Sequence, residues 1–293
     1  MTRAGFVALA GRPNAGKSTL LNQIVGAKVA ITSPRPQTTR RAIRGVSTGP
    51  DWQLVVVDLP GVQKPRDPLT ERMQRRMDAE LRDSDAALFV VNGHEKIGPG
   101  DRFIAEAIKK AGLPTVTVLN KVDLLDRTAI VQRLHAVAEF EVQGEIFPVS
   151  AKSGAGVADV VRTLIELMPE SPLLYPPDEK TDLSLEVRLA EIVREQILHR
   201  THDEIPHAVE VQVDEINERE DGLITVLAHA WAETESQKGI LVGKGGRMVR
   251  DVGAGARKEM EALLGRKVFL DLRVRVRKGW RRDESLLDRL GIE

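Results

Sequence analysis

Gly11-Arg-Pro-Asn-Ala-Gly-Lys-Ser-Thr19 is the stretch that decides the fold, because it matches the phosphate-loop pattern G-x-x-x-x-G-K-[ST]. The apolar run Phe6–Ala10 directly before it predicts a buried strand, and the residues after it predict a helix. A glycine turn that matched the pattern by chance would need neither the strand nor the helix. The stretch therefore predicts a loop that binds the phosphates of a nucleotide.

Each part of this loop has an expected contact with the nucleotide. Glycines leave room for backbone N–H groups to close around the β-phosphate, and the N-terminus of the following helix adds the positive end of its dipole. Lys17 is expected to reach the β- and γ-phosphates, and the Ser18 hydroxyl is expected to bind Mg²⁺. The predicted phosphate-binding residues are Gly11, Asn14, Ala15, Gly16, Lys17, Ser18, Thr19, Asp58 and Gly61.

Five short apolar runs before residue 150 have the length of buried strands, and polar stretches with helical spacing separate most of them. This alternation predicts an α/β fold with a parallel sheet covered on both faces. The runs are Phe6–Ala10, Leu54–Val57, Ala87–Val91, Val116–Leu119 and Ile146–Val149. Four prolines within residues 169–177 predict an extended linker. We therefore expect a nucleotide-binding domain at residues 1–170, a linker at 171–180 and a second domain at 181–293.

Two motifs further along the chain select the base. Asn120-Lys-Val-Asp123 supplies the Asp123 carboxylate, which can accept hydrogen bonds from N1–H and the 2-amino group of guanine, a pair of donors that adenine lacks. In Ser150-Ala-Lys152, the Ala151 N–H is expected to donate to guanine O6. These motifs predict GTP rather than ATP. The predicted guanine-binding residues are Asn120, Lys121, Asp123, Ser150, Ala151 and Lys152.

The γ-phosphate and its metal are expected to contact two other segments. Asp58-Leu-Pro-Gly61 follows a buried run, so Asp58 should face Mg²⁺ and the Gly61 N–H should sense the γ-phosphate, although the motif taken alone equally describes a strand-end turn. The segment at residues 33–41, SPRPQTTRR, predicts a mobile switch loop, with a solvated basic loop as the alternative. Thr39 is the predicted Mg²⁺ ligand beside Ser18, and Thr38 is the alternative.

No residue of this sequence can be assigned to orient the water that attacks the γ-phosphate. Ras-like GTPases place a glutamine directly after the Asp-x-x-Gly motif, whereas this chain has Val62 there, which predicts slow basal hydrolysis. Gln63 is one residue further along. Asn14 is a candidate ligand for a potassium ion beside the β- and γ-phosphates; the alternative is that it only shapes the turn.

The second half of the chain has the pattern of an RNA-binding domain. The formal net charge of the whole chain is zero, yet residues 238–293 carry 15 basic and 8 acidic side chains, which suits a polyanionic partner. An amphipathic helix at Leu183–Leu198, strands at Ala208–Ile216 and Leu223–Ala230, two helices around a glycine-rich turn, and a strand at Val268–Val276 are predicted. Arg281–Leu290 is expected to form a short terminal helix.

The glycine-rich turn contains a G-x-x-G motif, which in a KH domain lets an RNA backbone pass close to the protein. A second mononucleotide loop and a plain turn are the alternatives, but no Gly-Lys-Ser/Thr follows the motif. The order helix, strand, strand, helix, helix, strand and the basic charge favour the KH interpretation. The predicted RNA-binding residues are Gly243, Lys244, Gly245, Gly246 and Arg247.

With both halves in view, the whole chain resembles the Era family of bacterial GTPases with a C-terminal KH domain. The matching segments are GRPNAGKSTLLN (11–22), ITSPRPQTTR (31–40), DLPGV (58–62), NKVD (120–123), SAK (150–152), GILVGKGGRM (239–248) and KGWRRDESLLDRLG (278–291). The resemblance implies a TRAFAC-class, Ras-like P-loop GTPase domain followed by a type II KH domain. It also implies binding to the 3′ region of 16S ribosomal RNA, a role in assembly of the small ribosomal subunit, and a cytoplasmic protein that associates peripherally with the inner membrane.

Two classes of function remain in view. The first is a switch in which GTP, GDP and Mg²⁺ control RNA binding, with no small-molecule substrate beyond GTP. The second is a GTP-dependent factor that remodels or modifies RNA, for which the sequence contains no further catalytic constellation. The chain has no cysteine, so disulfides and thiolate chemistry are excluded. His199 and His202 are three residues apart but are better explained as a solvated helix end.

Overall fold

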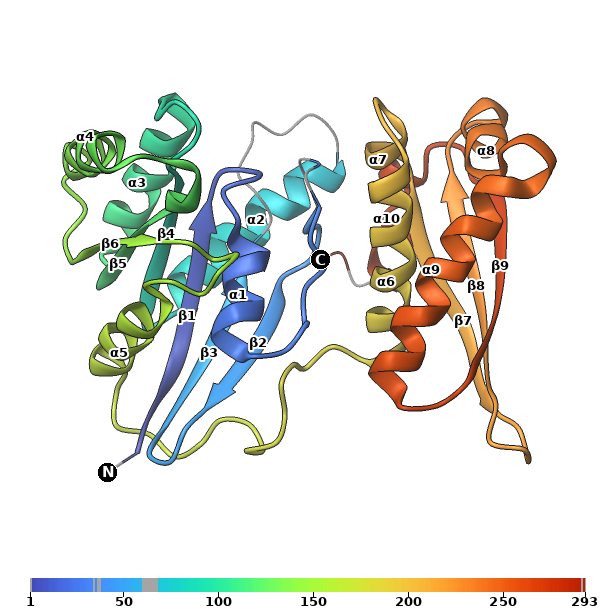
Figure 1. Ribbon diagram of the computed structural model, residues 1–293, viewed down its shortest axis with the longest axis horizontal. Helices are drawn as coiled ribbons and strands as arrows, with labels where there is room; N and C mark the ends of the chain where they lie inside the picture. The colour runs from blue at the N-terminus through green and yellow to red at the C-terminus, as the bar shows by residue number, and fades with distance from the viewer. Residues whose placement is uncertain (1, 34, 36–37, 60–67, 291, 293) are drawn as a thin grey trace. The chain divides into compact units, whose positions relative to one another are not determined.

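The computed structural model describes residues 2–33, 35, 38–59, 68–290 and 292. The chain folds into two compact units, and the main division falls between Asp182 and Leu183 (Figure 1). Among the described residues, none of the helices combines the length and the apolar character needed to cross a membrane.

The first unit is built on a six-stranded sheet with the order β2-β3-β1-β4-β5-β6. All pairs are parallel except β2 with β3. The strands are β1 (Arg3–Gly11), β2 (Ile43–Thr48), β3 (Trp52–Asp58), β4 (Ala86–Asn92), β5 (Thr115–Asn120) and β6 (Ile146–Val149). The five predicted strands are all present. Strand β2 is not predicted from the sequence, because IRGVST contains only two large apolar residues, which are separated by Arg44 and Gly45.

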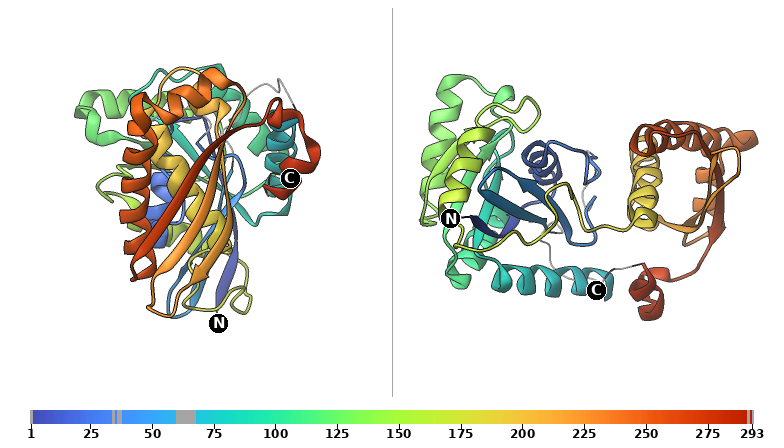
Figure 2. Two further views of the ribbon diagram at one scale, coloured as in Figure 1. Left: turned by 90° about the vertical axis from the view of Figure 1, so that its right-hand side faces the viewer. Right: turned by 90° about the horizontal axis from the view of Figure 1, so that it is seen from below.

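Helices cover both faces of this sheet, as the alternating pattern predicted (Figures 1 and 2). They are α1 (Lys17–Val25), α2 (Pro68–Asp83), α3 (Pro99–Ala111), α4 (Arg127–Ala138) and α5 (Val157–Leu167), with a 3₁₀ turn, η1 (Val122–Leu124). Side chains of α2, α3 and α4 form one buried cluster with alternate residues of β1 and β4, such as Ala8 and Phe89. Helices α1 and α5 contact each other and the sheet. This layout brings the carboxyl ends of β1, β3, β4 and β5 to one edge of the sheet, where open α/β sheets bind ligands.

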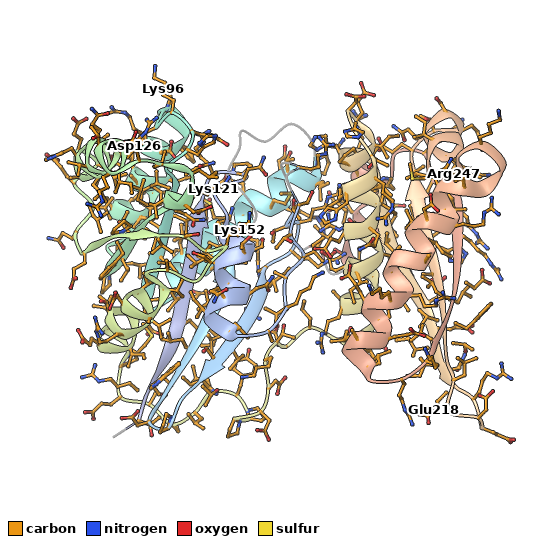
Figure 3. The ribbon with its side chains drawn as sticks, in the orientation of Figure 1. Lys96, Lys121, Asp126, Lys152, Glu218 and Arg247 are labelled. Carbon is orange, nitrogen blue, oxygen red and sulfur yellow. The ribbon has the colours of Figure 1, made fainter. Side chains whose placement is uncertain are left out.

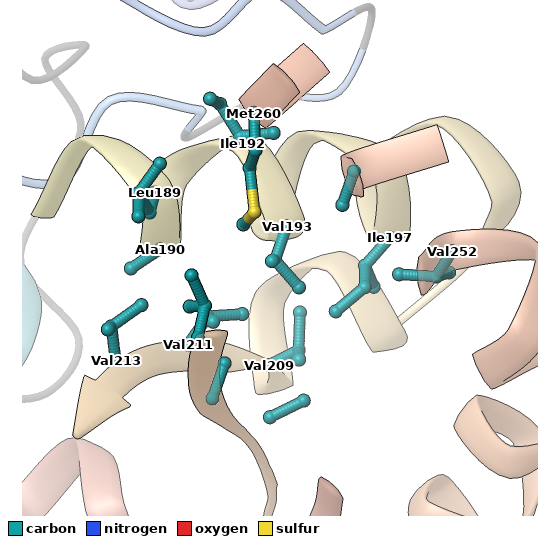
Figure 4. Packing of buried hydrophobic residues seen from close by; sticks show 14 of the residues in the cluster. Leu189, Ala190, Ile192, Val193, Ile197, Val209, Val211, Val213, Val252 and Met260 are labelled. Atoms are coloured by element: carbon teal, nitrogen blue, oxygen red, sulfur yellow. The ribbon is translucent and has the colours of Figure 1, made fainter. Parts of the chain in front are cut away.

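The second unit has the predicted order of helix, strand, strand, helix, helix, strand. Its main elements are α6 (Leu185–Arg200), β7 (Glu210–Glu218), β8 (Ile224–Ala232), α8 (Glu235–Val242), α9 (Arg247–Leu264) and β9 (Val268–Val276). Shorter elements are α7 (Ile205–Ala208), η2 (Lys244–Gly246), η3 (Trp280–Arg282) and α10 (Glu284–Arg289). In the sheet, β8 pairs antiparallel with β7 and parallel with β9. Apolar residues of α6 and α9 pack against the sheet in one core, part of which Figure 4 shows.

Helix α6 differs from its prediction in one respect. The sequence predicted one buried face, but all ten residues from Leu189 to Leu198 are buried. Two of the buried charges form an ion pair within the helix, in which Arg194 Nη2 lies 2.7 Å from Glu191 Oε2. Charged side chains that are paired and hydrogen-bonded can be buried in their charged form. The spacing of apolar residues along the helix does not predict such burial.

The proline-rich linker is not extended throughout, because it bends at residues 174–175 and forms a turn in which Glu179 N donates to Pro176 O at 3.0 Å. It also remains hydrogen-bonded to the first unit. The side chain of Gln53 is fully buried and forms hydrogen bonds with Leu174 and Tyr175. Further along, Val46 N donates to Lys180 O at 2.9 Å, so the linker pairs with the outer edge of β2. The segment that leads to the second unit is therefore hydrogen-bonded to the six-stranded sheet of the first unit.

Candidate nucleotide site and RNA-binding loop

The predicted phosphate loop connects β1, which ends at Gly11, to α1, which begins at Lys17. Two of its glycines are required by close approach. A Cβ at Gly11 would lie 2.5 Å from Val90 O, and a Cβ at Gly16 would lie 2.2 Å from Asn120 Nδ2. Gly16 also has a φ of 95°, and Asn14 has a φ of 62°. Asparagine tolerates this left-handed region better than most residues do.

Lys17 lies under this loop and is almost completely buried. Its Nζ donates to Gly11 O at 3.1 Å and to Arg12 O at 3.3 Å. Burial lowers the pKa of Lys17, while the nearby Asp58 carboxylate opposes that shift. A cation held by backbone oxygens inside an electropositive loop is suited to meet an anionic ligand.

Three oxygen-bearing side chains converge beside Lys17. The Ser18 hydroxyl donates to Asp58 Oδ2 at 2.6 Å, and the Thr39 hydroxyl donates to the same atom at 3.0 Å. The two hydroxyl oxygens are 3.2 Å apart. Asp58 is fully buried, and burial raises the pKa of its carboxyl group. Two hydroxyls and a carboxylate form the hard oxygen donor set that Mg²⁺ prefers. The predicted Mg²⁺ residues Ser18 and Thr39 are thus brought together.

The guanine motifs lie at the same edge of the sheet. Asn120 ends β5, and its amide bridges two segments: Nδ2 donates to Ala15 O at 2.8 Å, and Oδ1 accepts from Ala151 N at 2.9 Å. The Ala151 N–H, expected to donate to guanine, is engaged by Asn120 in this structure. Lys121 has a φ of 66°, and Asp123 lies exposed in η1.

Lys121 and Lys152 appear at the same end of the first sheet in Figure 3. Ser150 is buried, and its hydroxyl accepts from Ser153 N at 3.3 Å. The remaining expectations for the γ-phosphate concern Gly61, Val62 and Gln63, and these residues lie outside the part of the chain that the structure describes.

The G-x-x-G motif joins α8 to α9 through the 3₁₀ turn η2, as predicted. Gly243, Gly245 and Gly246 all have positive φ, at 72°, 61° and 76°. Within the part of the chain that the structure describes, no heavy atom beyond the adjacent residues lies within 4 Å of a Cβ built at Gly245 or Gly246, so the loop has open space beside it. Lys244 and Arg247 are exposed, and Figure 3 shows Arg247 on the surface of the second unit.

Arg250 was not among the predicted residues, but its side chain is hydrogen-bonded to the backbone of this loop. Its guanidinium donates to Gly245 O at 3.0 Å and to Gly246 O at 3.2 Å. The carbonyl groups of Gly245 and Gly246 therefore accept hydrogen bonds from a cation in the first turn of α9. The spacing of four residues from Gly246 was a signal that could have identified it, because residues four apart lie on one helix face.

Arg12 and Asn92 were also missed at the nucleotide site. Arg12 forms ion pairs with Glu95 and Asp101, both at 2.9 Å, and Asn92 Nδ2 donates to Asn14 O at 3.3 Å. Asn92 belongs to no nucleotide motif, and Arg12 occupies a variable position of the phosphate-loop pattern. Their partners are distant in the sequence, so only the fold reveals the contacts.

Comparison with known proteins agrees with this geometry in both halves of the chain. The family model described as a 50S ribosome-binding GTPase matches residues 6–121, and the KH domain model matches residues 204–281. GTPase Era of Lactobacillus helveticus is 43% identical over 291 residues, covering 99% of this chain and 96% of the relative. GTPase Era of Mycobacterium tuberculosis is 46% identical over 295 residues, covering 99% and 98%.

Solved structures give the same result over the full length. A crystal structure of an Aquifex aeolicus Era variant bound to GDP·AlF₄⁻ matches with a TM-score of 0.95 and 33% identity, covering 99% of both chains. A crystal structure of Era with MgGDPNP and nucleotides 1506–1542 of 16S ribosomal RNA matches with a TM-score of 0.95 and 34% identity, covering 100% of this chain and 99% of that one. With these relatives and with its phosphate loop and KH loop in this order, the chain belongs to the Era family of GTPases.

Proposed function

We propose that this chain binds GTP with Mg²⁺ at the phosphate loop, hydrolyses it slowly to GDP and phosphate, and uses the nucleotide state to control RNA binding. Residues 1–170 act as the GTP-binding domain, residues 171–180 as the linker, and residues 181–293 as the RNA-binding domain. The RNA is the 3′ region of 16S ribosomal RNA, bound during assembly of the small ribosomal subunit. This target is taken from the Era relative whose crystal structure contains that RNA.

One observation carries the nucleotide half of the proposal: Ser18, Thr39 and Asp58 converge beside the buried Lys17. Ser18 and Thr39 would hold Mg²⁺, with Asp58 accepting from both hydroxyls. The metal would neutralise charge on the phosphates during transfer. The phosphates would be bound by the loop residues, with Gly61 completing the set.

Guanine would be selected by Asp123, with Asn120 fixing the position of the phosphate loop relative to the base. The amide of Asn120 lies between the loop and residue 151, which supports this role. Lys121, Ser150, Ala151 and Lys152 complete the proposed base site. For Ala151 to donate to guanine O6, its N–H must exchange its present bond to Asn120 Oδ1 for the ligand.

The route from nucleotide to RNA runs, in this proposal, along β2. Thr39 lies four residues before Ile43, where β2 begins, and the outer edge of β2 pairs with linker residues 180 and 181. Arg44 donates to Asp182 Oδ2 at 3.0 Å and pairs with Glu80 of α2 at 2.9 Å. A change at Thr39 on loss of the γ-phosphate would therefore reach the residue directly before the second unit.

In the second unit, RNA would cross the open side of the G-x-x-G loop. Gly243, Gly245 and Gly246 would allow the sugar–phosphate backbone to approach, and Lys244 and Arg247 would pair with phosphates. The exposure of both cations and the open space at Gly245 and Gly246 support this role. The proposal extends to a cytoplasmic protein that associates peripherally with the inner membrane, as the family resemblance implies.

The test compares Ser18→Ala with Thr39→Ala in titrations of GDP and a non-hydrolysable GTP analogue, each with Mg²⁺ and with EDTA. Ser18→Ala should weaken the Mg²⁺-dependent binding of both nucleotides. Thr39→Ala should weaken only the GTP analogue, because its ligand role depends on the γ-phosphate. Equal loss of GDP and GTP analogue in Thr39→Ala would show that the proposed metal site is wrong.

A further inference from the structure

The segment between β4 and α3 contacts the phosphate loop through two side chains, one at the end of β4 and one in the loop itself. The first is Asn92, which ends β4 and is buried. Its Nδ2 donates to Asn14 O at 3.3 Å, and its Oδ1 accepts from His94 N at 3.1 Å. The amide is therefore held at both ends, and its orientation is fixed by the backbone of its own segment.

Asn92 has a counterpart on the neighbouring strand. In the parallel register of β4 and β5, Asn92 lies opposite Asn120. Asn120 donates to Ala15 O, and Asn92 donates to Asn14 O. Two adjacent strand ends thus hold two successive carbonyl groups of the phosphate loop. Asn120 belongs to the guanine motif, whereas Asn92 has no motif of its own.

The second side chain is Arg12, whose guanidinium reaches three oxygen atoms of the same segment. It contacts Glu95 Oε2 and Asp101 Oδ2 at 2.9 Å each, and Lys96 O at 3.2 Å. Asp101 is buried and also accepts from Gly98 N at 2.9 Å, so it caps the start of α3. Arg12 is therefore anchored to a helix terminus. Its own carbonyl oxygen accepts from Ala15 N and from Lys17 Nζ.

These contacts hold a loop that needs support. Asn14 has a left-handed backbone, which non-glycine residues adopt only when the surroundings favour it. The N–H groups of a phosphate loop stabilise an anion best when they already point at it, because no reorganisation is then needed. Ties at residues 12 and 14 fix the arm of the loop that precedes Gly16.

We propose that Asn92 and Arg12 are positioning residues of the GTP site, which hold residues 12–14 in the conformation that presents the loop N–H groups to the β-phosphate. The inference rests on the proposed function of this loop as the phosphate site. Neither side chain needs to touch the nucleotide. Because GDP and GTP share the β-phosphate, loss of either tie should weaken both nucleotides by the same factor.

Asn92→Ala tests the first tie in the full-length chain. Removing one net hydrogen bond predicts that the Kd values of GDP and of a non-hydrolysable GTP analogue both rise about five- to tenfold. Ser84→Ala is the matched control, because it removes a buried hydroxyl that donates to Glu80 O at 2.7 Å, away from the phosphate loop. The Tm of the nucleotide-free protein should fall by a similar amount in both variants, while only Asn92→Ala should lose affinity.

Arg12→Lys and Arg12→Ala test the second tie. A lysine keeps the charge but cannot offer the planar fork of donors, so it should restore only part of the affinity lost in Arg12→Ala. If the wild-type protein bound neither GDP nor the GTP analogue, the proposed function itself would be wrong. Normal wild-type binding, with Kd values in Asn92→Ala within twofold of Ser84→Ala, would overturn the positioning role alone. So would an affinity loss matched by a larger fall in the Tm of the nucleotide-free protein than Ser84→Ala shows.

Discussion

Replacing Gln53 with alanine should loosen Leu174 and Tyr175 of the linker from the first unit. Gln53 is a fully buried residue of β3, and its amide forms four hydrogen bonds. Three of them cross to the linker: Oε1 accepts from Leu174 N at 2.7 Å and from Tyr175 N at 2.9 Å, and Nε2 donates to Tyr175 O at 3.0 Å. The fourth goes to Thr48 Oγ1, within the first unit.

The size of the effect follows from those three bonds. A typical intramolecular hydrogen bond contributes about 1 kcal/mol net, which gives about 3 kcal/mol for the three. The released backbone groups can turn to water because Leu174 is already exposed, so about 2 kcal/mol is the better expectation. Since about 1.4 kcal/mol corresponds to a factor of ten, the local opening equilibrium should shift by about 30-fold.

Hydrogen exchange of the Leu174 and Tyr175 N–H groups in the full-length protein measures this opening directly. Gln53→Ala should lower their protection about 30-fold, whereas amides in β1 and β5 should keep theirs. Thr48→Val is the control, because it removes only the bond that does not reach the linker. Unchanged protection at Leu174 and Tyr175, or an equal loss throughout the first unit, would refute the reasoning. If the linker transmits the nucleotide state, the variant should also show a smaller effect of GTP on RNA binding.

Three other predictions concern the base, the RNA loop and the water. Asp123→Asn should favour xanthine nucleotides, whose 2-oxo group accepts where guanine donates; a variant that still prefers GTP over XTP in competition would contradict the assignment. Placing aspartate at both Lys244 and Gly245 should weaken RNA binding by at least a few kcal/mol, because it adds negative charge and blocks close approach, while basal GTP hydrolysis stays near wild type; equal loss of both activities would argue against separable domains. Val62→Ala should change GTP turnover little, because no catalytic group is lost. If Asn14 holds a potassium ion, GTP turnover at matched ionic strength should be faster in potassium than in sodium. Equal turnover in the two cations, or full potassium activation in Asn14→Ala, would rule out that role.

The sequence predicted the architecture because its local signals agree with each other. The five predicted strands are parallel and are read as short apolar runs, whether fully buried like β4 or at the sheet edge like β6, whereas β2 contains Gly45 and few large apolar residues. A Cβ at Gly45 would lie 2.6 Å from Leu21 Cδ1, so helix α1 packs closely on the strand at this glycine, a contact between elements distant in the sequence. The periodicity of apolar residues cannot predict such a contact. It also cannot predict that the polar face of α6 is buried between Leu189 and Leu198.

The site was predictable where a motif carries its own chemistry. The sequence predicts Thr39 rather than Thr38 as the Mg²⁺ ligand; in the structure the Thr39 hydroxyl donates to Asp58, and its role as a ligand stays a prediction. Arg250 could have been identified from its position four residues after Gly246. Arg12 and Asn92 were not predictable, because Arg12 pairs with Glu95 and Asp101 and Asn92 bonds to the backbone of Asn14, all distant in the sequence. Their roles depend on hydrogen-bond partners, which composition and spacing do not specify.

The central claim is that one chain couples the nucleotide state of its first unit to RNA binding by its second. The most direct measurement is retention of small ribosomal subunits by the immobilised full-length protein, with GDP and with a non-hydrolysable GTP analogue. The account predicts stronger retention with the GTP analogue, and it predicts that this difference disappears in Thr39→Ala. Equal retention of the subunits by the wild-type protein in both nucleotide states would contradict it.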